Sequence, residues 1–248
     1  MKNKINPNSN TYIIMYSAAL VVVVAFLLAF IYESLKNIQD DNVALDKKKQ
    51  ILAALNIRDL SDEEAAERYA KVVVADRVID ERGKTLEKGE NGGEKAGFKL
   101  TSADAKVGRL AVYVCKVNGN TKYVLPVYGM GLWGSIWGYV AINNDLNTIY
   151  GAYFDHESET AGLGAEIKDS RAWQEQFKGK HIFANGGDAV ALSVVKKSEV
   201  KDSTTQCEAV TGATLTSDGV SQMLKNSLNR YYVFFQQNKQ TKEVMRHE

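Results

Sequence analysis

The chain has 248 residues, of which 45% are apolar and 25% charged, a composition typical of a folded globular protein. Its formal net charge of +1 argues against a nucleic-acid-binding protein, which would carry a surplus of Lys and Arg on one face. The two cysteines and three histidines show no metal-ligand spacing, so we expect no zinc or iron–sulfur centre held by this chain alone. Any redox chemistry would then need an organic cofactor or partner subunits.

An apolar segment near the N-terminus predicts a single transmembrane helix over residues 12–32. No charged residue lies between Ile5 and Tyr32, and at about 1.5 Å per residue the segment spans a hydrocarbon core of about 30 Å. The alternative is a cleaved signal peptide, which would have a shorter apolar core and a small-residue cleavage site, and residues 29–33 offer no such site. We therefore expect a retained anchor surrounded by membrane lipid.

Basic residues on the two sides of this segment set its expected orientation. Lys2 and Lys4 precede it, whereas Lys36 and the basic run 47–49 follow it among acidic residues. Counting only the basic residues close to the helix slightly favours a cytoplasmic N-terminus. Residues 1–11 are therefore predicted to be a short cytoplasmic segment, with the large domain outside the cytoplasm.

Two helices and a polar region are predicted after the anchor. Residues 33–58 read as a helix leaving the membrane, with apolar residues that share one face, namely Val43, Ile51, Leu52 and Leu55. Ser61, with Glu64 three positions later, is a capping box that starts a helix running to about Ala75. Residues 80–104 are polar and glycine-rich, and they predict a surface loop or hairpin.

Four strands in two hairpins are predicted next, and they cover 110–117, 122–128, 136–143 and 148–154. The connecting residues 118–121 and 144–147 carry Asn, Gly and Asp, which hairpin turns favour. A short helix over Ser170–Lys178, a strand over 189–195 and an amphipathic helix over Asp218–Asn238 complete the prediction. Antiparallel hairpins bracketed by helices indicate an α+β fold with one antiparallel sheet and flanking helices.

The segment Thr211–Ser217, with the sequence TGATLTS, has the properties of a phosphate-bearing attachment site. Its threonine hydroxyls stand among small residues, and Gly212 and Ala213 leave the backbone open to a phosphate. The segment also precedes the predicted terminal helix, whose N-terminus would favour an anion. A plainer alternative is that Thr216 or Ser217 only caps the helix while Gly212 forms a turn.

Residues Thr211-Gly212-Ala213-Thr214 resemble the Ser/Thr-Gly-Ala-Thr flavinylation signature. In the families that carry it, a flavin transferase moves FMN from FAD onto the last Thr through a phosphoester bond. The resemblance therefore implies covalent FMN on Thr214, with Thr216 as the second choice. An acidic residue, most often Asp, usually lies six positions before that Thr, and here the residue is Glu208.

Two further segments resemble one family, the C subunit of the Na+-translocating NADH:quinone reductase. Residues 128–134 (YGMGLWG) are similar to its YGxGLWG segment, and residues 159–164 (ETAGLG) to its ETPGLG segment, with Ala161 in place of Pro. Together with the single anchor and the chain length, the resemblance covers nearly the whole sequence.

The resemblance implies a flavin pocket formed by these three segments. Apolar surface for the isoalloxazine ring would come from Leu132, Trp133 and Leu163. Gly162 would admit backbone N–H groups to the ring, while Glu159 and Thr160 would orient the loop or the ribityl chain. The cofactor-binding residues expected around Thr214 are Thr211, Gly212, Ala213, Leu215 and Thr216.

Several residues of these segments and their neighbours also have simpler structural explanations. Core packing is the alternative for Trp133 and Trp137. His156 and Glu157 fit polar residues at a strand end better than an acid–base pair or a metal site. Cys207 reads as a buried or incidental thiol.

Membership of this family would make the chain a covalent-FMN electron carrier in a bacterial inner-membrane pump that oxidises NADH, reduces quinone and exports Na+. The chain would not be catalytic alone, because no GxGxxG follows a strand. Its partners would be the other integral-membrane and NADH-oxidising subunits and, during maturation, a flavin transferase. The expected FMN-binding domain covers 105–238 on the periplasmic side, between a helical and loop region over 33–104 and a polar tail over 239–248.

Three alternatives belong to other classes of protein. The first is the flavin subunit of an Rnf-type ferredoxin:NAD oxidoreductase, which shares the anchor and the attachment motif. The second is a membrane-tethered flavin-binding sensory module, and the third is an assembly subunit without a chromophore. The YGxGLWG segment and the chain length favour the quinone reductase.

Overall fold

The structure, a computed structural model, describes residues 9–90, 92–184 and 187–247. The chain divides into two compact units, one up to Asp46 and one from Lys47 onward. The first unit holds most of helix α1 (Asn10–Ala54), whose apolar side chains are exposed along the predicted anchor, residues 12–32. Within the described residues, α1 is the one helix that is long and apolar enough to cross a membrane, by length and composition.

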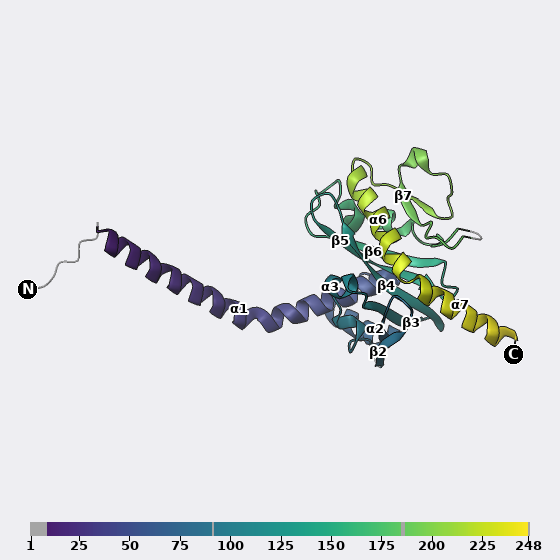
Figure 1. The fold of residues 1–248 in the computed structure, drawn as a ribbon, viewed down its shortest axis with the longest axis horizontal. Helices are drawn as coiled ribbons and strands as arrows, with labels where there is room; N and C mark the ends of the chain where they lie inside the picture. The colour runs from purple at the N-terminus through teal and green to yellow at the C-terminus, as the bar shows by residue number, and fades with distance from the viewer. Residues whose placement is uncertain (1–8, 91, 185–186, 248) are drawn as a thin grey trace, which may run out of the picture. The chain divides into compact units, whose positions relative to one another are not determined.

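The second unit, here called the domain, holds the last turns of α1 and all later elements (Figure 1). Its strands are β1 (Val73–Ile79), β2 (Thr85–Glu90), β3 (Leu110–Val117), β4 (Asn120–Met130), β5 (Ser135–Asn143), β6 (Ile149–His156), β7 (Ser193–Val195) and β8 (Gln206–Glu208). Its helices are α2 (Asp62–Val72), α3 (Ser102–Lys106), α4 (Glu166–Asp169), α5 (Arg171–Glu175), α6 (Thr214–Arg230) and α7 (Tyr232–His247). Two short 3-10 turns, η1 (Gly97–Lys99) and η2 (Lys197–Glu199), complete it.

Six strands form one antiparallel sheet in the order β2-β1-β3-β4-β5-β6, and β7 pairs in parallel with β8. The two predicted hairpins are confirmed as β3–β4 and β5–β6. The first turn is tighter than predicted, because Asn118 and Gly119 both adopt positive φ, 50° and 78°, and β4 starts at Asn120. Two such residues match the right-handed twist of the strands that they join. The α+β fold with one antiparallel sheet is therefore confirmed.

The N-terminal helices differ from the prediction at their ends. α1 ends at Ala54 and not at residue 58, and Asn56 just beyond it adopts a φ of 59°. The predicted face of α1 is buried at Ile51, Leu52 and Leu55, but Val43 is 62% exposed and does not belong to it.

The capping box of Ser61 and Glu64 is confirmed at the start of α2. However, α2 stops at Val72 instead of Ala75, and β1 follows without a loop. The valine run from Val72 to Val74 explains this switch, because β-branched side chains favour strands over helices. At the start of the polar region 80–104, residues 80–84 form a turn that leads into β2, and β2 pairs with β1 as a hairpin.

The helix predicted over residues 218–238 is two helices, α6 and α7, and α6 starts four residues earlier, at Thr214. The prediction relied on the helical spacing of apolar residues from Val220 onward, which does not mark the first turn, and the cap position Ala213 makes no side-chain hydrogen bond. The strand predicted over 189–195 is limited to the three residues of β7.

Helix α6 runs across one face of the sheet and forms the core with it (Figure 1). A Cβ added to Gly129 of β4 would lie 2.6 Å from Cβ of Met223, so only glycine allows this close approach. Ser227 Oγ also hydrogen-bonds to the backbone N–H and carbonyl of Tyr128, at 3.2 and 3.3 Å. These contacts fix α6 on β4, and they thereby fix the position of its first turn.

Lys47 connects the last turns of α1 to the rest of the domain. Its ammonium group donates to the carbonyl oxygens of Phe98, at 2.5 Å, and Leu100, at 3.0 Å. Burial lowers the pKa of Lys47 to about 8, although the carboxylates of Asp76 and Asp104 act in the opposite direction.

Replacing Lys47 by Met should change how the stability depends on pH. The pKa of Lys47 is about 8 in the folded chain and 10.5 without burial, so the unfolded chain binds more protons between these values. The free energy of unfolding of the wild type, minus that of Lys47→Met, should therefore rise by about 2–3 kcal/mol between pH 8 and 10.5. Denaturant unfolding of the full chain in detergent measures this difference, and a flat or falling difference would contradict the prediction.

Candidate functional site

The tip of the β4–β5 hairpin presents two apolar side chains to solvent. Gly131 N–H donates to the carbonyl of Gly134 at 2.8 Å, which closes the turn. Leu132 and Trp133 between them are 47% and 66% exposed. Core packing, the alternative considered for Trp133, is therefore wrong. Trp137 in contrast is partly buried, and its indole N–H donates to Gln50 Oε1 at 3.1 Å.

A buried carboxylate connects this hairpin to α6. Glu159, in the loop after β6, is only 7% exposed. Its Oε1 accepts a hydrogen bond from the backbone N–H of Trp133 at 2.9 Å, and its Oε2 accepts one from the Thr216 hydroxyl at 2.6 Å. Three of the predicted segments thus meet at a single side chain. Cβ atoms added to Gly131 or Gly164 would each lie 2.4 Å from one of its carboxylate oxygens, so a side chain at either position would displace the carboxylate from this place.

The rest of this loop places Leu163 beside the attachment motif. The carbonyl of Thr160 accepts hydrogen bonds from the N–H groups of Leu163, at 3.1 Å, and Ala165, at 3.0 Å. Gly162 adopts a φ of 73° within this turn, which favours glycine. Leu163 is 43% exposed, and a Cβ on Gly212 would lie 2.9 Å from its Cδ2.

The three threonines of the motif differ in their surroundings. Thr211 and Thr214 are exposed, whereas Thr216 is 1% exposed and donates its hydroxyl to Glu159. Ser217 is fully buried, and its hydroxyl accepts a hydrogen bond from Val210 N–H at 3.0 Å. Neither Thr216 nor Ser217 caps the helix, because α6 already begins at Thr214, so the capping alternative is wrong.

Since Ala213 supplies no capping side chain, the first-turn N–H groups of α6 receive no acceptor from it. The end of α6 therefore has no side-chain cap at Ala213, and its positive dipole end favours an anion. It is held close to the hairpin, because a Cβ added to Gly219 would lie 2.4 Å from the carbonyl oxygen of Met130. Glycine at position 219 is a tertiary requirement that no turn or repeat in the sequence indicates.

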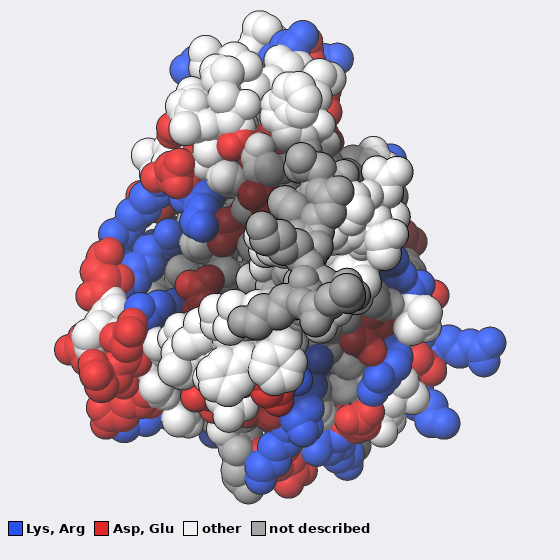
Figure 2. Space-filling view, turned by 90° about the vertical axis from the view of Figure 1, so that its left-hand side faces the viewer, with Lys and Arg blue, Asp and Glu red and all other residues white. Residues whose placement is uncertain are grey.

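Exposed apolar side chains gather around this helix end, and we call this group the apolar patch. It consists of Met130, Leu132, Trp133, Leu163 and Leu215, which are 43–66% exposed. Figure 2 shows that the upper end of the domain, where α6 begins in Figure 1, is mostly uncharged, while Lys, Arg, Asp and Glu intermingle lower down. A soluble surface rarely groups large apolar residues in this way unless a ligand or a partner covers them.

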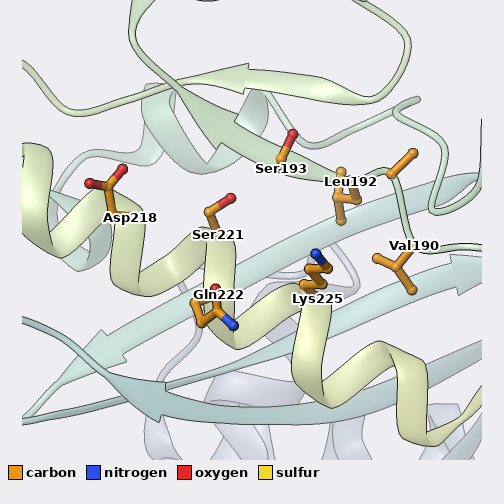
Figure 3. A pocket seen from close by; sticks show the side chains of 8 residues that line it. Val190, Leu192, Ser193, Asp218, Ser221, Gln222 and Lys225 are labelled. Atoms are coloured by element: carbon orange, nitrogen blue, oxygen red, sulfur yellow. The ribbon is translucent and has the colours of Figure 1, made fainter.

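Two open hollows flank the motif. One, of about 450 Å³, is lined by Gly162, Glu166, Ser170, Ala172, Trp173, Gln176, Glu208, Ala209, Val210 and Thr211. The other, of about 460 Å³, runs along α6 and is lined by residues 190–193 together with Asp218, Ser221, Gln222 and Lys225 (Figure 3). The first hollow brings Glu208, the acidic residue before the motif, next to Thr211 and the Gly162 loop. The second contains none of the predicted flavin residues.

Other polar candidates have structural partners. His156 Nδ1 accepts a hydrogen bond from Glu159 N–H at 3.1 Å, and Glu157 Oε2 accepts one from Ser135 N–H at 3.3 Å. Cys115 and Cys207 are both free thiols in buried positions, and burial raises the pKa of Cys207 to about 12. Among the described residues no group of His, Cys, Asp and Glu has the arrangement of a metal site.

Comparison with known proteins gives consistent matches. The profile of the FMN-binding domain family matches residues 131–229, which include the hairpin tip, the Glu159 loop and most of α6. The C subunit of the Na(+)-translocating NADH-quinone reductase of Haemophilus ducreyi is 31% identical, over 90% of this chain and 91% of its own length. The chain belongs to this family of C subunits.

Solved structures from the family have the same fold. The crystal structure of the C subunit from Parabacteroides distasonis is 36% identical, covers 81% of this chain and 96% of its own, and superimposes with a TM-score of 0.74. Shewanella oneidensis NqrC gives 26% identity and a TM-score of 0.66, over 80% of this chain and 99% of its own. Membership of this family agrees with the resemblance seen in the sequence, in preference to an Rnf-type subunit.

Replacing Thr216 by Val should destabilise the domain by about 2 kcal/mol, because the buried Glu159 Oε2 loses its hydrogen-bond donor while the side-chain shape is kept. Thr211→Val is the matched control at an exposed position, and we expect it to change the free energy of unfolding by less than about 0.5 kcal/mol. Denaturant unfolding of both variants measures the effect. Equal effects of the two substitutions would show that the bond to Glu159 contributes nothing to stability.

Proposed function

We propose that the chain is the covalent-FMN electron-carrier subunit of a Na+-translocating NADH:quinone reductase, with FMN bound through Thr214. The observation that carries the proposal is the position of the Thr214 hydroxyl, which is exposed in the first turn of α6, a helix without a side-chain cap, beside the apolar patch. The exposed hydroxyl and the helix end without a side-chain cap suit a phosphate, and the apolar patch suits an isoalloxazine ring.

The helix end fits a phosphoester. Its negative charge would lie at the positive end of the α6 dipole, within reach of first-turn N–H groups that Ala213 does not cap. Gly212 adopts a φ of 79° and carries no side chain, so the backbone before Thr214 stays open to the phosphate oxygens. Leu215 and the buried Thr216 complete the first turn, and Thr211 lies just before it.

The apolar patch fits the ring system. Trp133 offers an exposed aromatic face, and Leu132 and Leu163 offer aliphatic surface from two different loops. When bound, FMN supplies one-electron transfer, and the residues of this chain would set its orientation and surroundings. Gly162 and Thr160 shape the loop that carries Leu163, and Glu159 fixes that loop against the hairpin and α6.

Attachment needs a partner enzyme, a flavin transferase with FAD as donor. A bond forms between Thr214 Oγ1 and the phosphorus of the FMN moiety, the pyrophosphate bond of FAD breaks, and AMP leaves with its electron pair while the hydroxyl proton is released. The hydroxyl of Thr216 is a poorer acceptor because it is buried and already donates to Glu159. The second choice made from the sequence is therefore disfavoured.

Thr214→Ala should abolish flavin attachment when the full chain is co-expressed with a flavin transferase. Intact-protein mass spectrometry should show the mass of one FMN on the wild type and none on the variant, with loss of in-gel fluorescence. Thr214→Ser should retain part of the loading, because its hydroxyl survives. Thr85→Ala is the control for an exposed threonine outside the motif, and it should stay loaded. Continued loading of Thr214→Ala would show that FMN is attached at another residue.

The carrier role places the chain among the other integral-membrane and NADH-oxidising subunits of the complex. In this proposal residues 12–32 span the bacterial inner membrane, residues 1–11 are cytoplasmic, and the FMN-binding domain over 105–238 is periplasmic, between the region 33–104 and the polar tail 239–248. Anchoring restricts the carrier to the membrane plane and raises its effective concentration near these partners. An open apolar patch leaves one side of the ring within reach of them.

Labelling of an introduced cysteine tests the orientation. Val107 is 76% exposed, whereas the native Cys115 and Cys207 are buried, so Val107→Cys provides one accessible thiol. A membrane-impermeant maleimide should label this variant in intact spheroplasts. Asn3→Cys, before the anchor, should be labelled only after permeabilisation. The reverse pattern would show that the domain lies in the cytoplasm.

A further inference from the structure

The loop that carries Leu163 has a second buried carboxylate at its base. Asp155, near the end of β6, is 3% exposed. None of the motifs in the sequence includes it, and it lies outside the segment 159–164 that contributes to the proposed FMN site. A buried carboxylate is costly unless several donors surround it, so its partners indicate what it holds in place.

One oxygen of Asp155 joins the beginning of the loop to its end. Oδ1 accepts a hydrogen bond from the backbone N–H of His156 at 2.8 Å, and it pairs with Nζ of Lys168 at 2.9 Å. His156 is the last residue of β6 and Lys168 belongs to α4, so the contact closes the intervening loop at its base. The Lys168 side chain is 43% exposed, and it can be changed without opening the core.

The other oxygen of Asp155 faces the interior of the domain. Oδ2 accepts hydrogen bonds from Gln50 Nε2 at 3.3 Å and from the Tyr153 hydroxyl at 3.2 Å. Gln50, at the end of α1, in turn accepts from the Trp137 indole of β5 at 3.1 Å. The base of the loop is thereby fixed to the last turns of α1 and to the sheet.

The two buried carboxylates act on the same loop. Asp155 holds the backbone of His156, whose Nδ1 accepts the N–H of Glu159, and the Glu159 side chain holds the backbone of Trp133 and the hydroxyl of Thr216. An unbroken series of contacts therefore runs from Lys168 to the hairpin tip and to the first turn of α6. Each contact lies within ordinary hydrogen-bond length.

We propose that Asp155, through its pairing with Lys168, is a positioning residue for the flavin: it closes the loop 156–168 and so fixes Leu163 and Glu159 relative to the hairpin and α6. This inference rests on the proposed FMN site. Asp155 does not contact the expected ring surface, and its effect would be transmitted through His156 and Glu159. Small displacements of a supporting residue are enough to change how a cofactor is held.

Amide hydrogen exchange tests the loop in the full chain without cofactor. In Lys168→Met and Asp155→Asn, the loop amides of Glu159, Leu163 and Ala165 should exchange at least about fivefold faster, while the β4–β5 ladder stays as in the wild type. Lys168→Arg keeps the cation and should restore the wild-type rates. Lys178→Met, an exposed lysine after α5, is the control for loss of a positive charge.

Flavin-loaded full chain, made beside a transferase, tests the consequence for the cofactor. The fluorescence anisotropy of the attached FMN should fall in Lys168→Met and Asp155→Asn, and its midpoint potential should shift toward that of free FMN. Lys168→Arg and Lys178→Met should match the wild type in both measurements. If the Asp155–Lys168 pair only stabilises the fold, neither substitution should change the anisotropy or the midpoint potential of the cofactor.

The outcomes separate the inference from the proposed function. If the wild type takes up no FMN at Thr214, the proposed function is wrong and the inference falls with it. If the wild type is loaded but both variants keep wild-type anisotropy and potential, the inference alone is wrong, whether or not loop exchange has changed. Faster exchange together with lower anisotropy and a shifted potential, restored by Lys168→Arg, supports it.

Discussion

The carboxylate of Glu159 is the interaction on which the rest of the site depends. It accepts one hydrogen bond from the β4–β5 hairpin and one from α6, so elements far apart in the sequence share one buried side chain. The surrounding glycines are a consequence of that position, since Cβ atoms at Gly131 and Gly164 would collide with it. A buried polar group is costly without its hydrogen-bond donors, so the hairpin and α6 both support the position of this side chain.

The position of α6 also determines which hydroxyl groups of the motif are buried and which are exposed. The first turn of α6 points Thr216 and Ser217 inward, where each has a hydrogen-bond partner, and leaves Thr214 in solvent. The difference in exposure between Thr214 and Thr216 thus follows from helical periodicity and packing, without any difference in the chemistry of the side chains. The same close packing, with Gly129 against Met223 and Gly219 against the Met130 carbonyl, keeps the helix end beside the hairpin tip.

Much of the fold could be predicted from local signals, such as the Asn118-Gly119 turn and the Ser61 capping box. The start of α6 could not, because Ala213 caps the helix without a side-chain bond and nothing in the sequence marks it. The grouping of Trp133, Glu159 and Thr214 came from family resemblance, since no spacing indicates that these segments meet. Asp155 was missed for a related reason: its donors come from α1, β6 and α4, and such a network exists only after folding.

The openness of the apolar patch has a thermodynamic consequence. Sites that retain a free small molecule usually enclose most of its surface, whereas Trp133, Leu132 and Leu163 present theirs to solvent. The apolar patch would therefore bind a dissociable flavin only weakly. The covalent link proposed at Thr214 would remove the need for affinity, because a tethered ring would return to this surface at a high effective concentration even though the surface is open. The domain could then leave the ring uncovered for electron exchange without losing it by dilution.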